Sequence, residues 1–111
     1  LLYVSSRGSY GAVYAQALDA TMRPVGRPEA VVVGERSEDF EAFHFFESRM
    51  DVADGTGRLA FVTKRGATDV IHLFDLRARR RVAMLGFDGL VALYSPALSA
   101  DGQTVVFTGI D

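Results

Sequence analysis

The sequence matches itself when it is shifted by 58 residues, and this internal repeat limits the possible folds more than any other feature. Residues 3–8 (Tyr-Val-Ser-Ser-Arg-Gly) then lie on residues 61–66 (Phe-Val-Thr-Lys-Arg-Gly) without a gap, and Val13 falls on Ile71. A repeat of this kind predicts stacked copies of one supersecondary unit, each of which buries the apolar face of its neighbour.

A second match joins Ala53-Asp54-Gly55 to Ala100-Asp101-Gly102, and an apolar run that ends in Phe61 or Phe107 follows each. The start of one unit therefore occurs at three places, near Leu2, Leu59 and Val105. The later spacing, 46 residues from Phe61 to Phe107, is the size of a β-propeller blade of about four short strands. The repeat predicts an all-β fold, a partial β-propeller with about two four-stranded antiparallel blades.

Short apolar runs separated by Gly, Pro or Asp-Gly agree with this fold, because Val, Ile, Phe and Tyr favour strands. The clearest runs are residues 2–5, 12–18, 31–33, 59–63, 70–76, 82–85 and 105–108. Residues 38–50 do not fit, since Phe40, Phe43, Phe46 and Met50 are spaced as on one face of a helix. A helix and an extended loop that places aromatic side chains in a core both remain open for this stretch.

The repeat divides the chain into three parts. We expect a degenerate blade in residues 1–57 with an insert at about 35–50, a second blade in residues 58–102, and the first strand of a further blade in residues 103–111. Propellers close with about four to eight blades, so two blades alone leave two apolar faces in water. We therefore expect a fragment of a longer protein, or a chain that oligomerises.

Residues 96–107 (Pro-Ala-Leu-Ser-Ala-Asp-Gly-Gln-Thr-Val-Val-Phe) resemble the Pro-x-Trp-Ser-Pro-Asp-Gly-x-x-Ile-Ala-Phe motif of TolB-type, WD40-like propeller repeats. Leu98 replaces the usual aromatic residue and Ala100 the usual Pro. Residues 69–76 resemble the Asp-Ile-Tyr-x-x-Asp-Leu segment of the same repeats, and His72 stands in place of the Tyr. Looser copies occupy residues 51–61 and 3–18.

The resemblance implies a non-enzymatic segment that acts as a protein–protein interaction scaffold. Its partners would be another protein or the remaining blades of the same propeller. The alternative is a substrate-gating propeller domain of a larger peptidase, either prolyl-oligopeptidase-type or metallopeptidase-associated. Residues 86–90, before Ser95-Pro96, are also similar to propeller segments of large bacterial envelope proteins, which implies a periplasmic, cell-envelope or secreted location.

No residue is assigned a catalytic, cofactor-binding or metal-binding role, and no cofactor is expected. Residues 55–60 match the Gly-x-Gly-x-x-Ala of a dinucleotide site, but that site needs a helix after it and a strand is expected here. No Gly-x-Ser-x-Gly elbow occurs, and the absence of Cys excludes a Cys nucleophile, a disulfide framework and a zinc finger.

The remaining polar candidates have plain structural interpretations. His72 points to the face opposite Ile71 and Leu73, so we expect it to pack in a core. We expect His44 to be partly buried with its hydrogen bonds satisfied, and a pH-sensitive contact is the alternative. The acidic residues Glu38, Asp39 and Glu41 favour a solvated charge run over a general acid/base pair.

Charge and hydropathy exclude two classes of partner. Arg77, Arg79, Arg80 and Arg81 form a basic cluster where one strand must turn into the next. Because the net charge is −2 and no aromatic residues interleave with the cluster, we expect a solvated turn and no nucleic-acid binding. No apolar run approaches the roughly 18 residues of a membrane span, so no membrane insertion is expected.

The aromatic residues at 40–46 either fill a blade interface or form an exposed patch for a partner.

Overall fold

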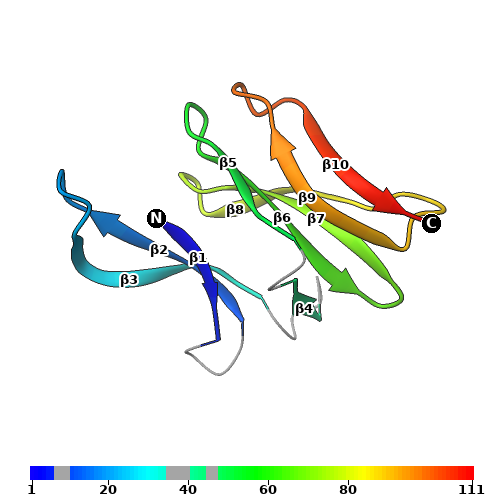
Figure 1. Ribbon diagram of the computed structural model, residues 1–111, viewed down its shortest axis with the longest axis horizontal. Coiled ribbons are helices and arrows are strands. Elements are labelled where there is room, and N and C mark those ends of the chain that lie inside the picture. Colours follow the sequence, from blue (N-terminus) through cyan, green and yellow to red (C-terminus); the bar gives the residue numbers. More distant parts are fainter. Residues whose placement is uncertain (7–10, 35–40, 45–47) are drawn as a thin grey trace.

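The computed structural model describes residues 1–6, 11–34, 41–44 and 48–111, and these residues form three antiparallel sheets without a helix (Figure 1). The all-β expectation is thus confirmed. No helix of the described residues is long and apolar enough to cross a membrane. The sheets follow one another along the chain and are called here the first, middle and third sheets.

The first sheet has its strands in the order β1-β2-β3. They are β1 (Leu2–Ser5), β2 (Ala12–Leu18) and β3 (Pro24–Val33). Asp19 shapes the turn between β2 and β3, because its carboxylate accepts hydrogen bonds from the backbone N–H groups of Thr21 and Arg23. An Asp side chain is short enough to accept hydrogen bonds from backbone N–H groups two and four residues ahead, and such bonds stabilise a tight turn.

The middle sheet is the centre of the molecule. Its strands are β4 (Ala42–Phe43), β5 (Asp51–Ala53), β6 (Arg58–Arg65), β7 (Thr68–Asp75) and β8 (Arg80–Leu85). The strands β4 and β5 both pair with β6, β4 near the end of β6 and β5 near its start. The strand order is β4-β6-β7-β8, and β5 pairs with β6 on the same side as β4. The sheet is therefore four strands wide, and the short strands β4 and β5 share the place beside β6.

The third sheet consists of β9 (Ala92–Leu98) and β10 (Val105–Ile110). Gly102 lies in the turn between them with φ of +69°. A Cβ at this position would lie 2.9 Å from Thr56 Oγ1, in the turn between β5 and β6. Glycine is therefore needed here both for the left-handed backbone and for the close contact between the two turns.

Both faces of the middle sheet are buried. On one face Leu59, Phe61 and Phe74 pack against Val13 and Val32 of the first sheet. On the other face Val62 and Ile71 pack against Leu93 of β9. Side chains alternate between the two faces of a strand, so burial of both faces requires an unbroken apolar run such as residues 59–62.

The repeat read from the sequence has a counterpart in the packing. Val13 and Ile71, which the shift of 58 residues superposes, are both fully buried. Val13 lies in the core between the first and middle sheets, and Ile71 lies in the core between the middle and third sheets. The first and middle sheets therefore present the same face to the sheet that follows them. The strands β1, β6 and β10 begin near the three expected positions.

The expected divisions at residues 57 and 102 do not coincide with the limits of the sheets. The strand β5 precedes residue 57 but pairs with β6, and β9 precedes residue 102 but pairs with β10. The repeat is most visible in sequence from the Asp-Gly turn onward, and that turn lies between the first and second strands of a sheet. The sequence unit therefore begins one strand later than the sheet.

The stretch that fitted neither pattern, residues 35–50, is described only in part. Its described residues contain the short strand β4 at Ala42–Phe43, so a helix over the whole of residues 38–50 is excluded. Phe43 is buried and packs on Phe61 with ring centroids 5.6 Å apart. Phe40, Phe45 and Phe46 lie outside the described residues, and so do Glu38 and Asp39.

Candidate functional site

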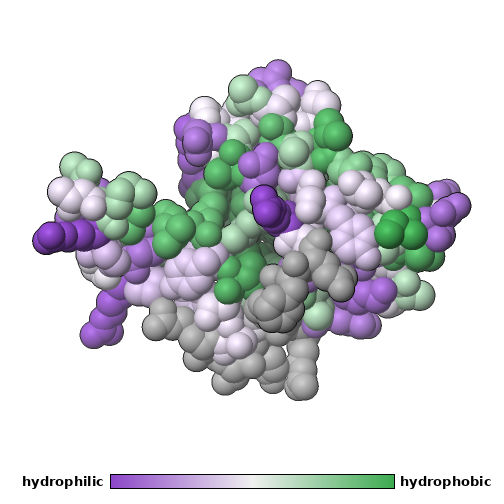
Figure 2. Space-filling model, viewed as in Figure 1, coloured by the Kyte–Doolittle hydropathy of each residue, from purple (hydrophilic) through white to green (hydrophobic). Residues whose placement is uncertain are grey.

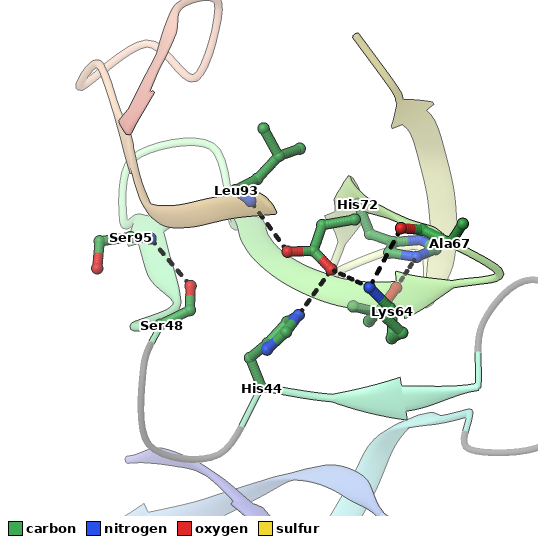
Figure 3. A network of polar contacts seen from close by, with 9 residues as sticks. His44, Ser48, Lys64, Ala67, His72, Leu93 and Ser95 are labelled. Carbon is green, nitrogen blue, oxygen red and sulfur yellow. Dashed lines mark hydrogen bonds and ion pairs between the residues drawn. The ribbon is translucent and has the colours of Figure 1, made fainter. Parts of the chain in front are cut away.

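Asp69, the second residue of β7, is a buried carboxylate at the junction of the middle and third sheets. Its side chain is only 2 % exposed. Oδ2 accepts a hydrogen bond from the backbone N–H of Leu93 at 2.9 Å, and Oδ1 lies 2.9 Å from His44 Nε2. Lys64 Nζ lies 3.8 Å from Oδ1 (Figure 3). Three other strand segments therefore meet at this one carboxylate.

These contacts follow from the pairing of β6 with β7. Asp69 lies opposite Lys64 in the register, on the sheet face that β9 covers. A buried carboxylate is costly unless it is paired and hydrogen-bonded. Because both oxygens of Asp69 have partners, the group ties His44 at the end of β4 and Leu93 of β9 to the middle sheet.

His44 meets the expectation of a partly buried histidine with its hydrogen bond satisfied. Its side chain is 22 % exposed, and its contact with Asp69 is an ion pair only when the imidazole is protonated. The sequence did not point to Asp69 as its partner, since the two residues are 25 positions apart.

His72 has the packing role that was expected. It is 2 % exposed, its ring stacks on Phe61 with centroids 5.0 Å apart, and Nε2 lies 2.8 Å from Thr63 Oγ1. Which atom donates depends on the imidazole tautomer. The side chain points toward the first sheet, on the face opposite Ile71, so His44 and His72 lie on different faces of the middle sheet and do not form one site.

The glycine-rich segment 55–60 is a hairpin turn followed by a strand, as expected. Residues 54–57 form the turn between β5 and β6, and β6 begins at Arg58. Gly57 has φ of +70°, and a Cβ there would lie 3.1 Å from Arg77 Cγ. The arrangement that would place a phosphate at a helix N-terminus is therefore not present in this segment.

The arginine cluster forms the exposed turn between β7 and β8 and the start of β8, as expected. Arg79 donates hydrogen bonds from Nη1 and Nη2 to the two carboxylate oxygens of Glu29 in β3, at 2.5 and 2.8 Å. This hydrogen bond and the charge of Arg79 lower the pKa of Glu29, and Glu29 in turn raises the pKa of Arg79. Arg77 donates to the carbonyl of Gly55. The cluster thus connects the middle sheet to the first sheet at its surface.

Two hollows border β1 and share Met50 in their walls, and together they are called here the β1 groove. The first measures about 340 Å³ and is bordered by Val4, His44, Arg49, Met50 and Phe61, among others. The second measures about 410 Å³ and is bordered by Leu2, Met50, Asp51, Asp54 and Leu76, among others. Apolar residues gather where the first sheet meets the middle sheet, as Figure 2 shows. No local pattern predicts this groove, because its walls come from separate repeats.

Within the described ranges, no three His, Asp or Glu side chains converge as a metal site requires. No protein-family model matches the chain, and neither a curated protein nor a solved structure matches it. The structure itself therefore defines the class: an all-β protein built from antiparallel sheets stacked face to face. Its described surface offers a groove and open sheet edges as candidate sites for binding.

Proposed function

We propose that this chain is a segment of a TolB-like β-propeller that acts as a non-enzymatic scaffold for protein–protein contacts. The observation that supports the proposal most is the stacking of the three sheets. The middle sheet is covered on both faces by sheets of the same chain, and repeat-related residues occupy equivalent positions in the two cores. Stacking of one repeated sheet on the next is how propeller blades bury their faces.

Exposed apolar residues on the outer two sheets agree with contacts to further protein. Val33 of β3 is 74 % exposed and Val106 of β10 is 67 % exposed. Contiguous apolar patches mark places where another protein surface packs, and Val33 and Val106 are apolar side chains that the outer faces would contribute to such a contact. In the proposed scaffold these faces receive either further blades or a protein partner, and the resemblance to envelope propellers favours a periplasmic or cell-envelope setting.

The two polar clusters of the described residues support a scaffold in another way. Asp69 and His72 both form their hydrogen bonds with groups of the same chain. A buried polar group with its partners in place specifies one packing arrangement. Asp69 and His72 therefore fix the packing of the sheets whose outer faces would contact other protein.

Site-specific photocrosslinking in cells of the source organism tests this function. A benzoylphenylalanine at residue 33 or 106 is expected to crosslink to protein, either further sheets of the same polypeptide or a separate partner. The matched control is the same label at residue 20, in the exposed turn between β2 and β3. Crosslinks that are no more frequent at residues 33 and 106 than at residue 20 would contradict the proposal.

The intact mass of the natural protein gives a second, independent test. A mass several times the 12.1 kDa of this chain agrees with a propeller segment. A natural mass near 12.1 kDa, together with a sharp and reversible unfolding transition of a monomer, would overturn it.

A further inference from the structure

A hollow of about 640 Å³ lies at one end of the middle sheet, between the β6–β7 turn and the connection from β8 to β9. It is called here the turn hollow, and the described residues that border it all lie between Arg65 and Val91. None of them belongs to the first or the third sheet. The turn hollow is therefore a property of the middle sheet and the connection that follows it, and its volume is in the range of small-molecule sites.

Hydrogen bonds and packing fix the connection that forms one wall of the turn hollow. The Leu90 N–H donates to Phe87 O at 3.2 Å, which closes a tight turn. The Asp69 N–H donates to Val91 O at 3.1 Å and ties the connection to β7. The Phe87 ring packs on Phe107 with centroids 4.6 Å apart. The chain alone therefore forms the hollow, as is usual for small-molecule sites.

The floor of the turn hollow is apolar, and its rim carries one charge of each sign. Val70 of β7 is only 5 % exposed, and Met84 of β8 is partly buried. Arg65 borders the hollow at the end of β6, and Asp88 borders it from the connection. Both charged residues are exposed. A ligand in the hollow would thus meet apolar side chains below and charged ones at its mouth.

The two rim charges have no ion-pair partner in the described part of the chain. None of the ion pairs there involves Arg65 or Asp88, so the two side chains are not paired with each other either. A guanidinium group binds a carboxylate through two parallel N–H bonds, and a carboxylate accepts hydrogen bonds from an ammonium group. The rim therefore offers one place for an anionic group and a separate place for a cationic group.

These charges favour a ligand that carries both signs. A ligand with a single charge is attracted by one rim group and repelled by the other, whereas a zwitterion can pair with both. An amino acid carries its ammonium and carboxylate groups on one carbon atom, but Arg65 and Asp88 are not in contact. A dipeptide with free ends separates its charges by a peptide unit and has side chains that can cover the apolar floor.

We propose that the turn hollow binds a short apolar peptide with free ends. Its carboxylate lies at Arg65, its ammonium group lies at Asp88, and its side chains pack on Val70 and Met84. Burial of the apolar side chains supplies most of the affinity, and the exposed ion pairs contribute modestly and select the charged ends. This site goes beyond the proposed scaffold function and does not depend on it.

Calorimetric titration of the natural protein with four dipeptides tests the proposal. Leucyl-leucine has both charges, its N-acetyl form lacks the ammonium group, and its amide lacks the carboxylate. Each capped form is expected to bind about fivefold more weakly, which corresponds to the loss of one exposed ion pair. Glycylglycine keeps both charges without an apolar side chain, so it is expected to bind at least about tenfold more weakly.

Two variants assign the ends of the ligand. Arg65→Gln should weaken binding of leucyl-leucine about fivefold and abolish its advantage over the amide, because the carboxylate has lost its partner. Asp88→Asn should likewise abolish the advantage over the N-acetyl form. Both replaced residues are exposed, so the fold is kept. Arg23→Gln, in the exposed turn between β2 and β3, is the matched control and should leave all four affinities unchanged.

Three results would overturn the proposal. They are no saturable binding of leucyl-leucine, equal binding of leucyl-leucine and its capped forms, and binding that Arg65→Gln and Asp88→Asn leave unchanged. The last result would place the ligand elsewhere in the natural protein. Residues 33 and 106 do not border the turn hollow, so crosslinking there with failure of the dipeptides would reject this site alone and keep the scaffold.

Discussion

Replacement of Asp69 by Ala should destabilise the fold by about 3 kcal/mol, which is a large part of the stability of a small domain. The largest contribution is the hydrogen bond from the Leu93 N–H, since a bond to a charged group contributes about 1.5–3 kcal/mol and its loss leaves a buried donor unpaired. The contact with His44 adds at most about 1 kcal/mol, because His44 is partly exposed and water can replace the carboxylate.

Asp69→Asn is the matched comparison, because it keeps the size and shape of the side chain. Its amide oxygen can still accept the Leu93 N–H, and its amide nitrogen can donate to His44 Nε2 in the tautomer that accepts. We expect a loss of about 1 kcal/mol, since one charge-assisted bond becomes a neutral one. Urea unfolding followed by far-ultraviolet circular dichroism measures both variants. A loss below about 0.5 kcal/mol for Asp69→Ala, or equal losses for both, would refute the role assigned to this carboxylate.

Three further outcomes are expected. Leu93→Ala should cost about 3 kcal/mol in the same unfolding assay, because it leaves a cavity in the core between the middle and third sheets, and a cost below about 1 kcal/mol would contradict that packing. Gly102→Ala should cost more than Gly66→Ala: both glycines have positive φ, but only at Gly102 would the new Cβ meet another residue, and equal costs would exclude the contact. The free energy of unfolding should also fall as the pH is lowered, because hydrogen bonds lower the pKa values of three carboxylates in turns. The main donor is the Arg23 N–H for Asp19, the Ala78 N–H for Asp75 and the Ser99 hydroxyl for Asp101. A group whose pKa is lowered by folding stabilises above its unfolded pKa and loses that contribution as the pH falls through its folded pKa, so a triple Asp-to-Asn variant should show a flatter decline of the urea midpoint between pH 5 and 2. An unchanged decline would place the acid sensitivity elsewhere.

The strands that the sequence predicted best are those with a buried face and few polar interruptions. The runs 59–63 and 70–76 correspond to β6 and β7, which the middle sheet buries on both faces. The strand β3 extends from Pro24, although only residues 31–33 stood out in the sequence. Pro28 and Arg27 obscured its first half, because a strand at the edge of a sheet tolerates residues that an internal strand does not.

The strand β9 was not among the expected runs for a similar reason. It contains Pro96, and Ser95 within it has φ of +48°, so the sequence reads as a turn rather than a strand. The contacts of Asp69 were harder to predict from the sequence than any strand. Asp69 looked like the start of an ordinary strand, and its partners His44 and Leu93 come from segments on either side in sequence. Local patterns carry no information about which buried groups meet across sheets.

Because the middle sheet is buried on both faces, its backbone should become exposed to solvent later than that of the outer sheets when the fold opens locally. Amide hydrogens of the outer sheets can exchange with solvent through local fraying, since each outer sheet has one face that no other sheet of the described residues covers. Those of the β6–β7 hairpin exchange only when a neighbouring layer separates, so they should be the last to exchange. The same dependence applies during synthesis. The hairpin emerges from the ribosome before β9 exists, and it acquires its second protecting layer only after the chain has been extended through Leu98.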